Sequence, residues 1–238
     1  MVNEHTIKSY DDELERLTRI ITEMGGLAED QVNNAVQAVT KRDSDLAVKV
    51  MGGDSKVDSL EADIDALTLR MLALRQPMGV DLRAVISSIK IASDIERIAD
   101  HAANIAKRAL ALNQTAPVKP VSAVPRLGLL AREILKGVLD AYVERDSKKA
   151  VELWNRDEEL DDLYTSIFRE LITYMMEDPR TITSCTHLLF IAKNLERIGD
   201  HATNIAETIY FLVEGEPLKA QRPKRDITST LSNEEKLE

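Results

Sequence analysis

The sequence has little of what sheet proteins and disulfide-stabilised domains depend on. Aromatic residues make up 4% of the 238 residues, and Cys185 is the single cysteine. One cysteine excludes a disulfide within the chain, which favours a reducing compartment. Because aromatics are scarce while Ala, Leu, Ile, Glu and Lys are frequent, the composition favours helices over a β-sandwich.

Long apolar runs are also missing. No run approaches the length of a transmembrane helix, and the first ten residues, which include Glu4, His5 and Lys8, carry no apolar signal region. We therefore expect a cytoplasmic protein that reaches a membrane only through its partners. The net charge of -10 repels phosphate backbones, so we expect no nucleic-acid partner, and it suits cation binding.

Apolar residues recur three or four positions apart almost throughout, as on one face of an α-helix. In the first half they form three stripes, at Tyr10–Ala28, Val57–Leu74 and Ile91–Ala109. Breaks are expected near 41–44 and 76–80. In the second half the pattern predicts helices over 124–144, 148–176 and 183–213.

The second half repeats the first. Arg42-Asp43-Ser44 returns as Arg145-Asp146-Ser147, and the segment 96–106 returns as 196–206 with nine of eleven residues identical. A repeat over several elements indicates internal duplication. Long helices with short turns pack as antiparallel neighbours, so we predict an all-α protein of two tandem three-helix bundles. The predicted parts are a first bundle at 1–113, a Pro-rich linker at 114–125, a second bundle at 126–214 and a disordered tail at 215–238.

Each half carries two pairs of carboxylates spaced four residues apart, so that the members of a pair lie one above the other on a helix. Antiparallel packing of the second and third helices should bring the two pairs of each half together. The predicted metal ligands are Asp54, Asp58, Glu96 and Asp100 in the first half and Asp157, Asp161, Glu196 and Asp200 in the second. Four converging carboxylates need counter-charge, and oxygen donors suit Mg, Mn, Ca or iron better than a tetrahedral structural zinc.

A simpler interpretation stays open beside the metal. Arg97 and Arg197 stand three residues from the aspartates of the third helices, so they can form ordinary ion pairs. His101 and His201 could bind a metal, accept a phosphoryl group or flank the site as hydrogen-bonded residues. Asn104 and Asn204 could orient ligands or serve packing.

The doubled E-R-I-x-D-H-A-x-N-I-A segment, with Met175–Arg180 and Met24–Leu27, resembles the PhoU family of phosphate-uptake regulators. The resemblance covers about Leu14 to Val213. It implies two tandem three-helix bundles. It also implies multinuclear metal clusters held by E(D)-x-x-x-D motifs, which match the eight carboxylates named above, with Mg, Mn, Fe or Zn as the metal.

The same resemblance implies a non-catalytic negative regulator of phosphate uptake and of the phosphate-starvation response. Such a protein couples the ATPase subunit PstB of the phosphate-specific ABC transporter to the sensor kinase PhoR. We also expect a homodimer, although the residue pattern does not fix the oligomeric state.

Three alternatives belong to other classes. A carboxylate-bridged metalloenzyme or metal-storage bundle of the di-iron type needs Glu-x-x-His, whereas the histidine here follows Glu96 by five. A helical nucleotide pyrophosphohydrolase needs basic residues beside the acidic rows. A histidine phosphotransfer protein would use His101 or His201, where neighbouring carboxylates repel the incoming group.

Overall fold

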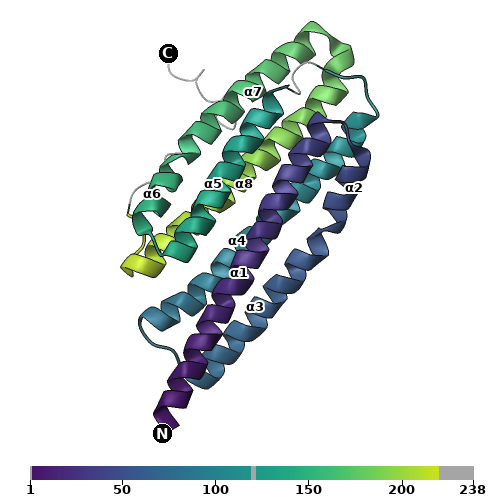
Figure 1. Ribbon diagram of the computed structural model, residues 1–238. Helices are drawn as coiled ribbons and strands as arrows, with labels where there is room; N and C mark the ends of the chain where they lie inside the picture. Colours follow the sequence, from purple (N-terminus) through teal and green to yellow (C-terminus); the bar gives the residue numbers. More distant parts are fainter. Residues whose placement is uncertain (1, 119–121, 220–238) are drawn as a thin grey trace.

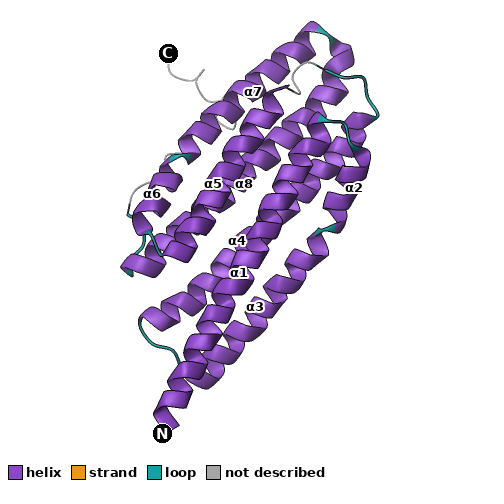
Figure 2. Ribbon diagram, viewed as in Figure 1, coloured by secondary structure: helices purple, strands orange, loops and turns teal. Residues whose placement is uncertain are grey.

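The computed structural model describes residues 2–118 and 122–219, apart from the side chains of residues 2–9 and Asp54. Three residues of the predicted linker and the predicted tail from residue 220 onward lie outside the described residues. The described part contains helices and no strand (Figure 2).

The first half contains α1 (Val2–Thr40), α2 (Ser44–Gly52), α3 (Asp54–Arg75) and α4 (Val80–Asn113). The second contains α5 (Val124–Glu144), α6 (Ser147–Asn155), α7 (Asp157–Glu177), the 3-10 turn η2 (Pro179–Thr181) and α8 (Ile182–Glu214). The predicted all-α fold of two three-helix bundles is confirmed, with α2–α3 and α6–α7 as the middle arms. Helix α5 begins inside the segment expected to be a linker, with Pro125 in its first turn, where a missing N–H costs nothing.

The middle arm of each half is broken, which the apolar pattern did not predict for residues 148–176. The breaks fall at Gly53 and Arg156, which are equivalent positions of the duplication. At the second break, Arg156 Nη2 forms an ion pair with Glu133 Oε2 of α5 at 3.0 Å. Each break makes the following aspartate the first residue of a helix, where the helix dipole favours negative charge.

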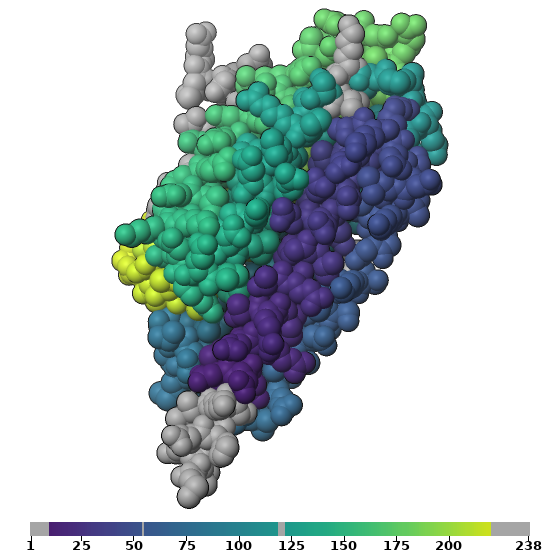
Figure 3. Space-filling model, viewed as in Figure 1, coloured from purple at the N-terminus to yellow at the C-terminus, as the bar shows by residue number. Residues whose placement is uncertain are grey.

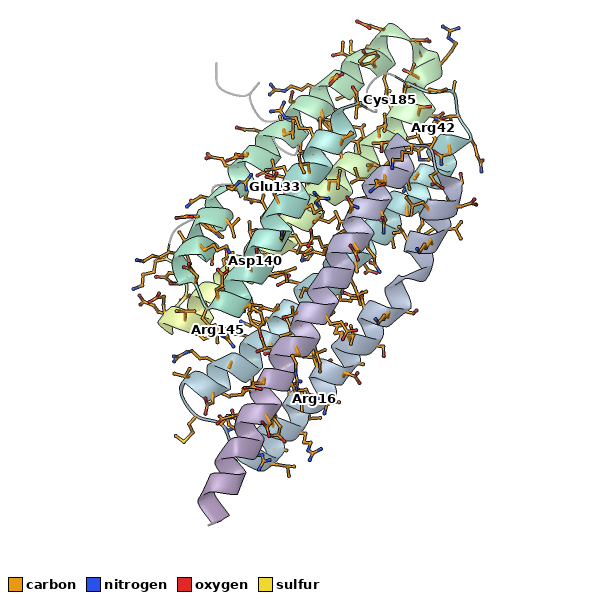
Figure 4. The ribbon with its side chains drawn as sticks, in the orientation of Figure 1. Arg16, Arg42, Glu133, Asp140, Arg145 and Cys185 are labelled. Atoms are coloured by element: carbon orange, nitrogen blue, oxygen red, sulfur yellow. The ribbon has the colours of Figure 1, made fainter. Side chains whose placement is uncertain are left out.

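The repeated Arg-Asp-Ser segment forms the first turn of each half. Arg42 and Arg145 both adopt a left-handed conformation, with φ of 55°, which ends the preceding helix. The aspartate that follows caps the next helix: Asp43 accepts a hydrogen bond from Leu46 N, and Asp146 accepts from Lys148 N and Lys149 N. Figure 4 places Arg42 and Arg145 toward opposite ends of the molecule, as an internal two-fold relation requires.

The two halves share one hydrophobic core. Helix α1 packs on α5 along one face (Figures 1 and 3), and α4 packs on α8 behind them (Figure 1). Cys185 of α8 is buried in this core. Within the described residues, no helix is both long and apolar enough to span a bilayer.

Two glycines let α1 and α5 approach closely. A Cβ added to Gly25 would lie 2.6 Å from Leu139 Cδ2, and a Cβ added to Gly128 would lie 2.5 Å from Val36 Cγ2. The two contacts are equivalent under the duplication, since each pairs a glycine of one half with an aliphatic residue of the other. Only glycine leaves room for these side chains at the observed helix separation.

Candidate metal centre

The second half buries four carboxylates where α7 packs on α8. Each of them is at most 6% exposed: Asp157, Asp161, Glu196 and Asp200. Burial raises the pKa of Glu196, and the nearby charge of Asp200 raises it further, whereas the hydrogen bond from Lys193 lowers it. The sequence therefore places a concentrated negative charge inside the bundle.

Basic side chains of α8 neutralise part of this charge. Lys193 Nζ lies 2.9 Å from Glu196 Oε1 and 5.0 Å from the centre of the Tyr164 ring. Arg197 Nη1 lies 3.1 Å from Asp200 Oδ2. The other oxygen of Glu196, Oε2, is buried and accepts no hydrogen bond from the described residues, although Arg197 Nε lies 3.7 Å away. This oxygen keeps capacity for a further cation.

The first half forms a more open version of the cluster. The side chain of Glu96 is 18% exposed and that of Asp100 is 39% exposed, and Arg97 lies 3.5 Å from both. Burial raises the pKa of Glu96, followed by the charge of Asp100, with smaller contributions from Glu61 and Asp58. The pKa of Glu61 is raised by burial and then by Asp65 and Asp58. The predicted ligand Asp54 cannot be placed, because its side chain lies outside the described residues.

The two clusters also differ at one position of the repeated motif. Position 199 is glycine, whereas the equivalent position 99 is alanine. A Cβ at Gly199 would collide with Leu160 Cδ2 of α7 and would lie 3.6 Å from Asp157 Oδ1. The glycine therefore leaves room for Leu160 of α7 beside Asp157, where the first half has Ala99 and the smaller Val57.

Three of the four supporting histidines and asparagines form contacts across the seam between α4 and α8, and the fourth, Asn104, lines a pocket there. The rings of His101 and His201 lie 5.5 Å apart. His101 Nδ1 lies 2.9 Å from Asn194 Oδ1, and His201 Nδ1 lies 2.8 Å from Asp94 Oδ1. Asn204 Nδ2 donates to the same Asp94 oxygen at 3.2 Å. Burial lowers the pKa of His101, although its bond to Asn194 raises it. These residues join the two halves.

The family is decided by comparison with known proteins. A family model described as the PhoU domain matches the chain twice, over residues 21–109 and 124–209. The chain belongs to the PhoU family. Two PhoU relatives are named "Phosphate-specific transport system accessory protein PhoU homolog". One, from Caulobacter vibrioides (strain NA1000 / CB15N), is 52% identical over 229 residues, covering 96% of this chain and 100% of the relative. The other, from Rhizobium meliloti (strain 1021), is 50% identical over 234 residues, covering 98% and 99%.

Solved PhoU structures have the same architecture. The crystal structure of PhoU from Pseudomonas aeruginosa matches with a TM-score of 0.85 and 39% identity, covering 87% of this chain and 100% of that chain. The structure of the phosphate transport system regulatory protein PhoU from Streptococcus pneumoniae matches with a TM-score of 0.81 and 31% identity, covering 89% and 100%.

The donor set of the second cluster fits the metal that the PhoU resemblance implies, because buried carboxylate oxygens are hard ligands. The fit is better than in the first half, where the carboxylates are more exposed. Across the described residues, however, no three or more His, Cys, Asp and Glu side chains are gathered closely enough to hold an ion as they stand. Lys193 and Arg197 would have to move aside, so the metal stays a prediction.

A search for identical positions in the two halves misses several residues of these sites. Lys193 stands where the first half has Ser93, and Tyr164 stands where it has Glu61. The seam residues Asp94 and Asn194 also differ. These residues could have been found in the sequence as equivalent positions near the repeated motif at which the two halves differ.

Proposed function

We propose that the protein is a negative regulator of phosphate uptake and of the phosphate-starvation response. The observation that carries the proposal is the PhoU match in both halves, together with full-length similarity to relatives named as accessory proteins of a phosphate-specific transport system. In this proposal the protein works in the cytoplasm as a stoichiometric adaptor, without turnover. Its partners are PstB, the ATPase subunit of the transporter, and PhoR, the sensor kinase.

The shape of the molecule supports an adaptor. The turn between α3 and α4 and the turn between α7 and α8 lie at opposite ends of the elongated bundle (Figure 1). Large apolar side chains are exposed at both ends: Leu74, Met78, Val80 and Leu82 at the first, and Met176 and Ile182 at the second. Exposed apolar patches mark contact surfaces, and two separate ends allow two partners to bind at once.

We further propose that the carboxylates bind a divalent or ferric cation, one of Mg, Mn, Fe or Zn. The buried charge of the second half and the unbonded Glu196 Oε2 support this. We also propose a homodimer, which is supported by the exposure of Leu69 and Leu74 along α3. Elemental analysis tests the metal, and the mass measured by light scattering during gel filtration tests the dimer. A monomeric mass across the working concentration range would exclude the dimer.

Gene deletion tests the regulatory role. Without the protein, phosphate-starvation genes should stay expressed in phosphate-rich medium, because the kinase loses its coupling to the transporter. The wild-type gene should restore repression. A variant with alanine at Arg97, Asp100, Arg197 and Asp200 should fail to restore it, because each half loses an acidic group and its ion-pair partner.

A matched control removes four exposed charges elsewhere, with alanine at Asp63, Arg70, Arg169 and Glu170. This variant should complement normally, and circular dichroism should show that both variants remain helical. Normal repression in the deletion strain would contradict the regulatory role itself.

A further inference from the structure

The seam between α4 and α8 carries two pockets that the duplication relates. One, of about 370 Å³, is lined by Asn104, Lys107, Arg108, Ala111 and Asn194. The other, of about 310 Å³, is lined by Lys90, Glu207, Thr208, Phe211, Pro217 and Leu218. The helices run antiparallel around the histidine pair, so the two pockets lie on either side of it.

The two pockets have opposite charge at equivalent positions. Where the first has Lys107 and Arg108, the second has Glu207 and Thr208. In the second pocket, Glu207 Oε1 accepts a hydrogen bond from Trp154 Nε1 at 2.8 Å, and Phe211 replaces a small alanine. The duplication therefore provides an internal comparison: the first pocket has two cations and no anionic side chain in its lining, whereas the second has one cation, Lys90, beside Glu207.

The cations of the first pocket are not neutralised by the ion pairs of the two helices. Neither Lys107 nor Arg108 takes part in the ion pairs that α4 and α8 make within the described part of the chain. The guanidinium of Arg108 lies 4.3 Å from the centre of the Phe190 ring, which fixes the position of its charge beside the pocket. Such a concentration of unneutralised positive charge is unexpected on a chain with a net charge of -10.

The lining groups match an oxyanion. An ammonium group and a guanidinium fork donate strong hydrogen bonds to phosphoryl oxygens. The amide of Asn104 can donate, and it can also accept from the P–OH group of hydrogen phosphate, which sulfate lacks. Asn194 donates to Phe190 O at 2.7 Å while its Oδ1 faces His101, so the amide is held at the pocket wall.

We propose that the pocket lined by Asn104, Lys107, Arg108 and Asn194 binds inorganic phosphate. The site lies at the junction of the two halves. Its residue Asn194 contacts His101, one member of the His101–His201 pair. The binding step does not depend on the regulatory proposal. Only its use, direct sensing of the anion by the regulator, rests on that function.

Isothermal titration of the purified full-length protein with sodium phosphate, at low ionic strength, tests the site. Lys107→Gln plus Arg108→Gln should weaken phosphate binding by roughly tenfold or more, because two charge-assisted hydrogen bonds to the anion are lost. The control Lys90→Gln plus Lys136→Gln removes the same charge, one of its residues lying in the related pocket, and should bind within about twofold of wild type. Sulfate at equal concentration should bind more weakly than phosphate in the wild type.

Absent binding in the wild type, or equal binding in all three proteins, would overturn the proposal, as would equal binding of sulfate. Circular dichroism checks that each variant is folded. If the variant changed at Lys107 and Arg108 restores repression in the deletion strain, the adaptor function is intact. Failure of the phosphate site is therefore distinguishable from failure of the regulatory role.

Discussion

Individual residues give the two carboxylate clusters different properties. In the second half, Gly199 leaves room for Leu160 of α7, and Glu196 is buried with a raised pKa. In the first half, Asp58 is exposed and Asp100 is only partly covered. Since water competes with protein ligands for a hard cation, the buried cluster should bind a metal more tightly.

Replacing both Glu196 and Asp200 with alanine should therefore weaken the tighter phase of Mn²⁺ binding by roughly tenfold or more, because two hard ligands are lost. The same change at Glu96 and Asp100 should leave that phase in place. Titration of chelator-treated protein, followed by elemental analysis, measures both. Equal and negligible uptake by the wild type and both variants would mean that these carboxylates are only ion-paired.

Metal uptake should also weaken as the pH falls. The carboxylate must be deprotonated to bind, and the raised pKa of Glu196 means that it takes up a proton at a higher pH than an ordinary glutamate, above its usual 4.5. As the pH falls, loss of affinity should therefore begin above pH 4.5 in the wild type. Metal uptake that stays constant as the pH is lowered to 4.5 would argue against Glu196 as a ligand.

At the scale of elements, the close crossing of α1 and α5 joins the halves. Gly128→Leu should lower the free energy of unfolding by roughly 2 kcal/mol, because the added side chain meets Val36, whose β-branched side chain has little freedom to move. Urea denaturation followed by circular dichroism measures the change.

Gly26→Leu is the matched control. Gly26 lies one residue from Gly25 in the same helix, but a Cβ there meets no atom within 4 Å. Because leucine is a better helix former than glycine, this variant should gain about 0.5–1 kcal/mol. Equal effects of the two substitutions would show that the α1–α5 contact contributes little to stability.

At the scale of the whole molecule, the two apolar ends should contact different partners. Met78 is 83% exposed at the α3–α4 end, beside an open pocket of about 390 Å³, and Met176 is 79% exposed at the α7–α8 end. Met78→Asp and Met176→Asp should each reduce binding of a different partner by roughly tenfold, since burying an uncompensated charge in an apolar contact is costly. Both changes are on the surface, so stability should change by less than about 0.5 kcal/mol.

Pull-down with the transporter ATPase and the kinase measures both contacts. Leu129→Asp on α5, which is 49% exposed and belongs to neither of the two apolar ends, should keep both partners. Retention of both partners by all three variants would move the contact surfaces elsewhere on the molecule.

The sequence by itself determined the helices, the duplication and the acidic pairs. Helical periodicity and i, i+4 spacing are local properties, so a helix over about 124–144 was predicted where α5 lies, and Glu96 and Asp100 were placed on one face. The breaks at Gly53 and Arg156 were not predicted, because the apolar pattern continues across them.

Only the tertiary structure decided which carboxylates are buried and what the histidines contact. The burial of Glu196 depends on how closely α7 approaches α8, and the contact of His101 with Asn194 joins residues 93 positions apart. Both follow from helix separation and crossing, which depend on side chains of two elements at once. The charge difference between positions 107–108 and 207–208 can be read from the sequence. That these residues line two related pockets follows only from the packing of α4 on α8.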